Sequence, residues 1–477
     1  MGSELKEFVL EELAAHKKNA IVGGPFGSNL VSKDYVDIGV PVIRGLNMGN
    51  GRWVSGEFAS VSETKSVQLA ANTARPGDLV FTQRGTLGQV AIVPSGPHEK
   101  YIVSQSQMKI TVNPKLVDVT FLYYFFSSPK QIEYIKTNAI QTGVPHTNLG
   151  ILRKTPLRLP NLNTQKAIGR TLSSLDDRIE LNHQINQTLE QIAQAIFKSW
   201  FIDFKPVKAK IAILEAGGSE EDALLAAMQA ISSKDQAELT RFQATQPEQY
   251  AELRTTAELF PSALQESDLG EIPEGWECLP LDQVAHYQNG LALQKFRPKN
   301  EDDFLPVVKI AQLKKGQADF KEKASPNIKP SCIIDNGDVI FSWSGSLMVD
   351  TWCGGRAALN QHLFKVTSDI YPKWLFFQFT QHHLEEFQRI AADKAVTMGH
   401  IKREHLKRAL CTIPSQAVIE KAGKSLGNIL NKQIELRLEA TTLSELRDTL
   451  LPKLLSGELS ISEAETQPTE AEEPANV

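Results

Sequence analysis

The chain has 477 residues, 41 % of them hydrophobic, and a formal net charge of −5. This hydrophobic content excludes global disorder, and the length predicts about three domain-sized units. No apolar run reaches membrane-spanning length, and the N-terminal stretch lacks the apolar core of a signal peptide. We therefore expect a cytoplasmic protein with no membrane contact. The four cysteines contain no CxxC pair, which argues against a zinc site or a disulfide framework.

The net charge conceals an uneven distribution of acidic residues. The tail from Ser460 to Val477 holds five acids and no base, and the segment from Glu215 to Glu258 holds nine acids and three bases. The rest of the chain is therefore net positive. A local basic surface that binds nucleic acid is compatible with this composition.

The first 160 residues predict an α+β domain, because short apolar strands are mixed with occasional helices. In chain order we expect an N-terminal amphipathic helix, a glycine-rich loop, a buried strand, a strand followed by a polar loop, another strand and an aromatic helix. These elements correspond to residues 1–18, Gly23–Leu30, Gly39–Gly45, Gly77–Gly88, Tyr101–Val112 and Val119–Thr137.

A long helix is predicted from Thr164 to Phe204, because apolar residues recur there at spacings of three and four. Pro206 is expected to end this helix, since proline cannot continue its hydrogen-bond ladder. The apolar stripe consists of Ile168, Leu172, Leu175, Ile179, Ile185, Leu189, Ile192, Ile196 and Trp200.

A second long helix of the same design follows Gln416, and Ile434-Glu435-Leu436 repeats Ile179-Glu180-Leu181. The stripe alone is equally compatible with a homodimeric coiled coil. The repeat within one chain favours an intramolecular antiparallel pair.

The second half of the chain repeats the order of elements of the first. Pro306–Leu313 matches Pro41–Met48, Gly337–Gly345 matches Gly77–Gly85, and Val396–Ile401 matches Val144–Leu149. We therefore predict a tandem repeat with approximate twofold symmetry, in which the framework strands recur and the polar loops differ. The predicted segments are globular domains at 1–160 and 269–414, spacer helices at 161–207 and 415–459, an acidic connector at 208–268 with helices at Ser219–Ile231 and Pro247–Leu259, and an acidic disordered tail at 460–477.

Catalytic motifs are weakly represented. AGKS at Ala422–Ser425 lacks the earlier glycine of a phosphate-binding loop and lies inside a predicted helix. The sequence contains no HExxH motif, and no GxGxxG follows a strand. The pair Asp176-Asp177 lies on the first long helix, where a solvated helix face is the favoured interpretation. We expect no catalytic residue, no metal site and no cofactor bound by this chain.

Amide, basic and histidine side chains gather in the predicted loops. Arginine can bind guanine through two hydrogen bonds, glutamine can do likewise with adenine, and lysine neutralises phosphates. A solvated basic surface is the alternative, but the same mixture recurs at matching places, which favours nucleic acid. The candidate DNA-binding residues are Arg44, Gln83, Arg84, Gln141, Thr142, His146, Thr147, Asn148 and Arg153 in the first half, and Lys309, Thr397, Met398, His400, Lys402 and Arg403 in the second.

Several motifs in this order resemble the specificity subunits of type I restriction-modification systems. They are GPFGSN (Gly24–Asn29), PVIRG (Pro41–Gly45), GDLVFTQRGTLG (Gly77–Gly88), FKSWFIDFKPV (Phe197–Val207), LGEIPEGW (Leu269–Trp276) and LLSGEL (Leu454–Leu459). The resemblance implies an α+β fold in which two globular target-recognition domains are joined by two long antiparallel coiled-coil helices. Each domain would read one half of a split double-stranded DNA target.

The same resemblance implies partners that do the chemistry. Two methyltransferase subunits would use S-adenosylmethionine, and restriction subunits with an ATP- and Mg-dependent motor would complete the nuclease. The side chains expected to touch these partners are Phe197, Trp200, Phe201, Phe204, Leu450 and Leu454.

Two other classes of protein compete with this interpretation. One is a nuclease or methyltransferase with an unfamiliar site, and the other is a coiled-coil assembly protein whose globular parts bind proteins. Because the loops of the two halves differ, a DNA target would be asymmetric. The helices would then set the number of base pairs between its half-sites, since domains held on one face of DNA must match its helical repeat.

Overall fold

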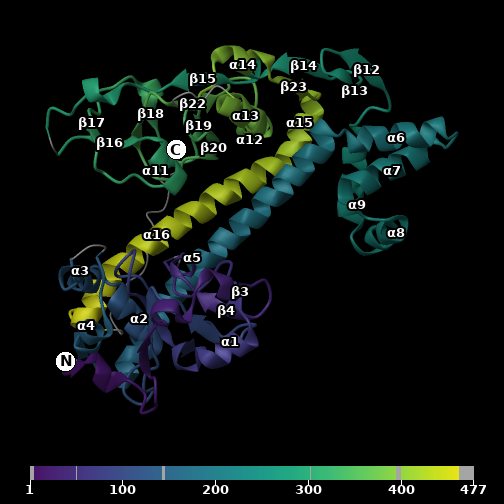
Figure 1. Cartoon of the computed structure of the whole chain (residues 1–477). Coiled ribbons are helices and arrows are strands. Elements are labelled where there is room, and N and C mark those ends of the chain that lie inside the picture. Colours follow the sequence, from purple (N-terminus) through teal and green to yellow (C-terminus); the bar gives the residue numbers. More distant parts are fainter. Residues whose placement is uncertain (1–4, 50, 142–144, 301, 394–398, 461–477) are drawn as a thin grey trace. The chain divides into compact units, whose positions relative to one another are not determined.

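The computed structural model describes residues 5–49, 51–141, 145–300, 302–393 and 399–460. The chain divides into two compact units (Figure 1). Unit 1 contains the chain up to Leu181 and from Ala440 onward, and unit 2 contains Asn182–Glu439. The division falls inside both long helices, so each unit includes part of each helix.

Unit 1 contains a four-stranded antiparallel sheet of order β2-β10-β7-β8 and a five-stranded sheet of order β3-β5-β4-β9-β6, in which β4 and β9 are parallel. Strands β4, β7 and β10 are buried along their whole length, which explains the apolar runs of β4 and β7; β10 also buries the polar side chains of Gln107 and Lys109. The strands are β1 (Lys6–Val9), β2 (Ile21–Gly23), β3 (Tyr35–Val36), β4 (Val40–Ile43), β5 (Ala59–Val61), β6 (Thr73–Ala74), β7 (Leu79–Thr82), β8 (Val90–Ile92), β9 (Tyr101–Val103), β10 (Gln107–Ile110) and β11 (Pro156–Leu159).

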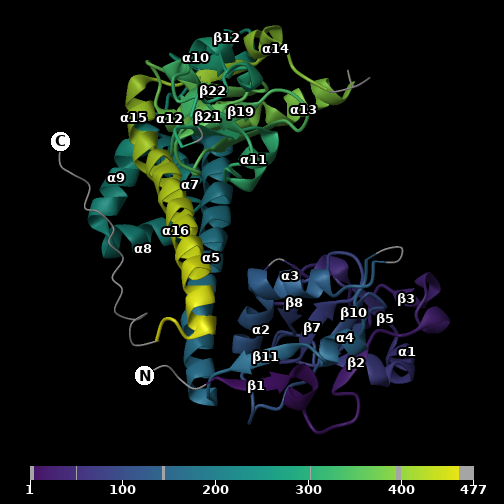
Figure 2. The same ribbon diagram turned by 90° about the vertical axis from the view of Figure 1, so that its left-hand side faces the viewer.

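The core of unit 1 lies between the four-stranded sheet and the long helices. Figure 2 shows α2 between the sheet and α5, and its aromatic residues are buried there together with Leu172 of α5 and Leu454 of α16. The helices of unit 1 are α1 (Glu63–Gln68), α2 (Val119–Ser127), α3 (Pro129–Thr137), α4 (Leu149–Arg153), the first part of α5 (Leu162–Phe197) and the last part of α16 (Asn428–Ser456).

Three predicted elements of unit 1 are corrected by the structure. The expected N-terminal helix is strand β1, which pairs with β11, followed by a short 3-10 turn that buries Leu10 and Leu13. The predicted strand Tyr101–Val112 is two strands, β9 and β10, which belong to different sheets. The predicted helix Val119–Thr137 is two helices, because Ser128 caps α3 and Pro129 occupies its first turn.

Unit 2 contains a four-stranded sheet of order β15-β22-β19-β20 and another of order β17-β16-β21-β18, in which β16 and β21 are parallel. The pairs β12-β13 and β14-β23 are antiparallel. The strands are β12 (Leu264–Ser267), β13 (Gly270–Pro273), β14 (Glu277–Pro280), β15 (His286–Asn289), β16 (Leu305–Val308), β17 (Lys323–Ala324), β18 (Ile333–Ile334), β19 (Val339–Ser342), β20 (Met348–Thr351), β21 (Ala357–Leu359), β22 (Leu363–Thr367) and β23 (Leu410–Ile413).

The acidic connector of unit 2 contains the helices α6 to α9. The sequence predicted α7 and α9 but did not reveal α6 and α8. Leu224, Met228 and Leu239 form a small core of the connector's own. The helices of unit 2 are α6 (Lys205–Glu215), α7 (Glu220–Ser232), α8 (Gln236–Thr245), α9 (Pro247–Glu258), α10 (Leu281–Val284), α11 (Ile310–Lys315), α12 (Lys373–His382), α13 (Leu384–Asp393), α14 (Arg403–Arg408) and α15 (Gln416–Ala422).

The predicted α+β tandem repeat is confirmed in its main elements. Each unit has a four-stranded sheet of the same order, a second sheet with one parallel pair, and an aromatic helix beside the long helices. A π-helical turn at Gly423–Gly427 lies between α15 and α16, and α5 has no such turn at the matching place. Because a π turn accommodates one extra residue, the repeat is displaced by one residue beyond it.

The end and the apolar stripe of the first long helix differ from the prediction. After α5 a π-helical turn covers Lys198–Ile202, and Phe204 adopts a left-handed conformation with φ of 52°. Pro206 lies in the first turn of α6, where proline needs no donor, so it follows the break. Ile185 and Ile192 are exposed, whereas Asn182 and Asn186 are buried.

The two long helices pair in antiparallel orientation. In unit 2, Asn182 Nδ2 donates to Leu436 O at 3.5 Å, and Gln433 Nε2 donates to Asn186 O at 3.4 Å. A later residue of α5 therefore faces an earlier residue of α16. Both views show the two helices side by side (Figures 1 and 2).

Among the described residues, no helix is both long enough and apolar enough to cross a membrane.

Replacement of Phe201 tests the role of the π-helical turn. Phe201 is fully buried and its ring lies 6.0 Å from the ring of Trp276 and 5.8 Å from that of Trp374. We expect Phe201→Ala to lower the free energy of unfolding by about 3–5 kcal/mol, because a large buried ring leaves a cavity. Urea unfolding of the purified chain measures this. The control Ile38→Ala, at a side chain that is 92 % exposed, should leave the free energy of unfolding unchanged. Equal losses in the two variants would contradict the assignment of Phe201 to the core.

Candidate nucleic-acid interface

In unit 1, loops from separate parts of the chain meet where β7 ends and β10 begins. Gln83 N donates to Ser106 O at 2.7 Å, and Thr147 N donates to Gln83 O at 3.0 Å. Arg84 and His146 face each other as an isolated antiparallel bridge. Because neighbouring antiparallel strands end and begin at the same edge, these backbone bonds gather the loops at one end of the sheet.

The side chains in this cluster play different parts. Arg84 is exposed, and Gln83 and His146 are half-buried beside it, so all three border the surface. Thr147 is buried and contributes through its backbone. Asn148 caps α4, because its Oδ1 accepts from Ile151 N at 2.9 Å. Sequence reasoning therefore grouped side chains that border the surface with side chains that are structural.

Unit 2 repeats this arrangement with other side chains. Ile401 N donates to Trp343 O at 3.0 Å, and Ser344 forms the isolated bridge with His400. The Trp343 indole lies 5.8 Å from the His362 ring and 6.3 Å from the His400 ring. His400 is exposed, and Ser344 Oγ lies 3.0 Å from His362 Nδ1. An indole and two imidazoles thus occupy the place of the first cluster.

These matching bonds correct the predicted alignment of the loops. The bridge partners make His146 equivalent to His400, and the two backbone donors make Thr147 equivalent to Ile401. The sequence alignment, which paired Leu149 with Ile401, was therefore displaced by two residues.

The remaining candidates lie around the clusters. Arg44 and Lys309 occupy equivalent places, because each donates its backbone N–H to the side chain three residues later, Asn47 and Gln312. Lys309 forms an ion pair with Glu322, which offsets its charge.

Arg403 donates to Tyr287 O at 3.1 Å and lies 5.6 Å from the Phe364 ring, so its guanidinium is held against the domain. Lys402 precedes α14 and is exposed. Arg153, at the end of α4, donates to Ile21 O at 3.4 Å, and Gln141 follows α3 and is exposed. Thr142, Thr397 and Met398 lie outside the described residues.

Exposed apolar side chains near the first cluster were missed by sequence reasoning. Phe26 is 79 % exposed and Leu46 is 82 % exposed. Gln105, in the turn between β9 and β10, donates to Gly27 O at 2.7 Å and so holds the loop of Phe26 beside the cluster. Large apolar side chains at the tip of a polar loop are the sequence signal that could have identified them.

The six side chains predicted to touch partner subunits lie in the cores. Phe197, Trp200, Phe201 and Phe204 belong to the core of unit 2, and all are less than 9 % exposed. Leu450 and Leu454 belong to the core of unit 1. In this conformation they present no surface, so a partner at this place would meet their exposed neighbours.

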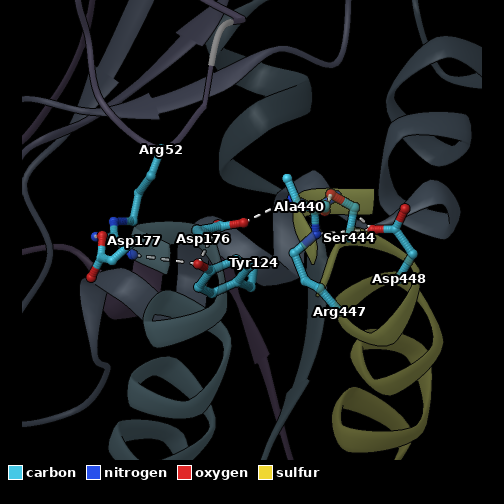
Figure 3. Close-up of polar contacts among 8 residues, drawn as sticks. All are labelled: Arg52, Tyr124, Asp176, Asp177, Ala440, Ser444, Arg447 and Asp448. Carbon is cyan, nitrogen blue, oxygen red and sulfur yellow. Dashed lines mark hydrogen bonds and ion pairs between the residues drawn. The ribbon is translucent and has the colours of Figure 1, made fainter. Parts of the chain in front are cut away.

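The paired carboxylates on α5 do not form a simple solvated face. Figure 3 shows Asp176 between Tyr124 of α2 and Arg447 of α16. Tyr124 Oη donates to Asp176 Oδ2 at 2.5 Å, and Arg447 Nη1 donates to Asp176 Oδ1 at 2.8 Å. Arg52 Nη2 donates to Asp177 Oδ1 at 2.6 Å. Burial, and after it the nearby Asp176 carboxylate, raises the pKa of Tyr124, so its hydroxyl remains a donor. The pair is therefore structural.

Comparison with known proteins identifies the family. The family described as type I restriction modification DNA specificity domain matches residues 7–191 and 273–440. The HindI specificity subunit of Haemophilus influenzae is 30 % identical over 425 residues, which cover 86 % of this chain and 92 % of that protein. The MjaIX specificity subunit of Methanocaldococcus jannaschii is 23 % identical and covers 93 % and 92 %.

A solved structure supports the fold. The type I restriction-modification S subunit from M. genitalium has a TM-score of 0.51 at 13 % identity and covers 95 % of this chain and 96 % of that one. The matched family and these relatives, rather than the solved structure, show that the chain is a DNA-recognition protein without catalytic activity of its own. It belongs to the family of type I restriction-modification specificity subunits. The predicted family and fold class are confirmed.

Substitution of Asn148 separates its capping role from a DNA-reading role. We expect Asn148→Ala to lower the free energy of unfolding by about 1 kcal/mol through loss of the cap, and Asn148→Ser to retain it. Denaturant unfolding provides the measurement. Loss of DNA affinity in Asn148→Ser at unchanged stability would instead assign this side chain to reading.

Proposed function

We propose that the chain reads a bipartite, asymmetric double-stranded DNA target and docks two methyltransferase subunits. One observation carries the DNA part of the proposal. The same backbone frame recurs in both units, through Thr147 N to Gln83 O and Ile401 N to Trp343 O, while the side chains on it differ. A common frame with different side chains suits two domains that read different sequences.

The chemistry of each cluster suits a different half-site. Arg84 and Gln83 offer several hydrogen-bond donors, which can pair with guanine or adenine edges in the major groove. Trp343, His362 and His400 offer aromatic faces and ring nitrogens instead. Phe26 and Leu46 add apolar contacts to the first cluster, of the kind that meet thymine methyl groups.

An exposed apolar strip on α5 supports the docking part of the proposal. Ile185 is 36 % exposed and Ile192 is 43 % exposed, and they lie seven residues apart on one helix. Residues two helical turns apart share a face, so the pair forms an exposed apolar strip on α5, beside the buried Asn182 and Asn186 that face α16. In this proposal an apolar surface of a methyltransferase subunit covers the strip.

The catalytic groups belong to the partners in this proposal. Methyltransferase subunits would supply S-adenosylmethionine, and restriction subunits would supply the ATP- and Mg-dependent motor. The assembly would act on DNA in the cytoplasm.

Variants of the two clusters test the division of the target. We expect Arg84→Ala with His146→Ala to relax one half-site, by about 10- to 100-fold for a lost bidentate pair, and His362→Ala with His400→Ala to relax the other. Methylated sites mapped in DNA exposed to the reconstituted complex provide the readout. Arg158→Ala, which removes an exposed arginine of β11 in unit 1, is the control. A change at both half-sites, or at neither, would contradict the proposal.

Charged substitutions on α5 test docking. We expect Ile185→Glu with Ile192→Glu to abolish copurification with the methyltransferase subunit, because two carboxylates would be buried in the interface. Thermal unfolding should change little, since both positions are exposed and glutamate suits a helix. Ile370→Glu, at a side chain of unit 2 that is 77 % exposed, is the matched control. Normal assembly of the double variant would exclude this strip.

A further inference from the structure

The outer strand of the four-stranded sheet is joined to the long helices differently in the two units. The outer strands are β8 in unit 1 and β20 in unit 2. Pairing with the neighbouring strand makes their positions equivalent, because Leu79 faces Ile92 and Val339 faces Thr351. By the same register, Ala91 occupies the place of Asp350.

In unit 1 the recognition domain presents a cation to an acidic helix. A loop covers the outer strand, with Val54 N donating to Ile92 O at 2.9 Å and Ile92 N donating to Arg52 O at 2.8 Å. The Arg52 side chain is 8 % exposed and reaches Asp177 of α5. Figure 3 shows the Arg52 side chain beside Asp177 and Tyr124, and the Tyr124 hydroxyl is 3.4 Å from Arg52 Nη1.

In unit 2 the polarity is reversed. Arg437 of α16 donates to the Asp350 carboxylate and, at 3.2 Å, to Thr351 O. In unit 1 the carbonyl of Ile92 accepts a hydrogen bond from the loop N–H of Val54. The equivalent carbonyl in unit 2, that of Thr351, accepts one from the guanidinium of Arg437 on α16. The domain contributes the anion and the helix the cation.

The spacer helices carry matching differences in charge. Beyond the π-helical turn, the repeat that aligns Ile179 with Ile434 also aligns Asp176 with Asn431 and Asp177 with Lys432. The first helix is therefore acidic where the second is neutral or basic.

From these contacts we infer that an ion pair ties each recognition domain to its own position on the long helices, and that the two ion pairs have opposite polarity. We call this arrangement keying. The Arg52 domain at the second place would bring its guanidinium toward Lys432, the residue that matches Asp177. The Asp350 domain at the first place would meet Asn182 where α16 has Arg437, so its carboxylate and Thr351 O would both lose the guanidinium that binds them. Like charges and unsatisfied groups of this kind disfavour wrong pairings.

Keying has a consequence for DNA that rests on the proposed function. If each domain reads one half-site, opposite ion-pair polarity fixes which half-site lies on which side of the spacer. Arg52, Asp177, Asp350 and Arg437 are then positioning residues for an asymmetric target, although none of them needs to touch DNA.

A charge-reversal cycle on the purified full chain tests keying without DNA. We expect Arg52→Glu and Asp177→Arg each to raise the equilibrium constant for unfolding at least about threefold, and the double variant to recover much of this loss. The control is the exposed pair Glu7 and Arg158, where Glu7→Arg, Arg158→Glu and their combination should have no effect. Independent, additive losses in the Arg52 and Asp177 variants would overturn the inference.

A chimera tests the positional consequence. Residues 5–160 are replaced by residues 273–414, so that the second recognition domain occupies both places. We expect this chimera to unfold more readily with the native helix than with Asn182→Arg, which supplies the arginine found at the matching position of α16. Equal stability would contradict keying, and if neither chimera folds, the charge-reversal cycle decides. Keyed stability without methylation at a bipartite site would leave the inference standing and contradict the proposed function.

Discussion

Each recognition domain has a core that is completed by a helix from the other half of the sequence. In unit 1, Leu450, Leu451 and Leu454 from the end of the chain are buried in the same cluster as Leu10 and Phe121. Burial of each leucine contributes about 1.5–3 kcal/mol. In unit 2 the aromatic residues at the end of α5, which begins in unit 1, are buried against Trp276 and Trp374. The duplicated halves are therefore interlocked rather than strung together, and neither has a complete core alone.

This interlocking explains the apolar motifs at the ends of the long helices. FKSWFIDF and LLPKLL are far more apolar than an exposed helix end requires. From sequence alone, such a patch suggests a docking surface. The structure assigns it to the core instead, and the exposed apolar side chains that remain on α5 are Leu181, Ile185 and Ile192. Glycines assist the same packing: a Cβ on Gly169 would lie 3.0 Å from Asp118 Oδ1, and one on Gly423 would lie 3.2 Å from Trp374 Nε1.

Much of the framework could be predicted because its signals are local. Strands β4, β7, β16 and β19 are largely apolar runs, and their repetition in the sequence predicts the tandem copies. Signals that depend on partners distant in sequence were missed. Strand β1 is strand only because β11 pairs with it, and a charged amphipathic stretch reads equally well as helix. The loop alignment was displaced because the letters around Val144 and Val396 matched, whereas the backbone bridges at His146 and His400 set the true register.

The sequence predicted which kinds of side chain make up the candidate site, but not which individual residues belong to it. Arginine, glutamine and histidine in matching loops indicated loops that the structure gathers at one end of each four-stranded sheet. Sequence could not separate Arg84, which is exposed, from Asn148, whose side chain caps a helix, because both are polar residues in loops. It also could not reveal His362 or Phe26, since these positions join the clusters only through the turns between β21 and β22 and after β2.

Stability alone does not explain the pairing of the long helices in unit 2. Asn182, Asn186 and Gln433 are buried between them, joined by hydrogen bonds of 3.4 and 3.5 Å between the helices. Such long bonds compensate poorly for the burial of polar amides, so apolar residues there would stabilise the pair more. Buried asparagines between paired helices are best known for specifying register and orientation at a cost in stability. Together with the ion pairs at Asp177 and Arg437, this polar layer indicates that the helices are selected for one arrangement rather than for the tightest association. Under the proposed function, in which the helices set the distance between two half-sites, one fixed arrangement matters more than additional stability.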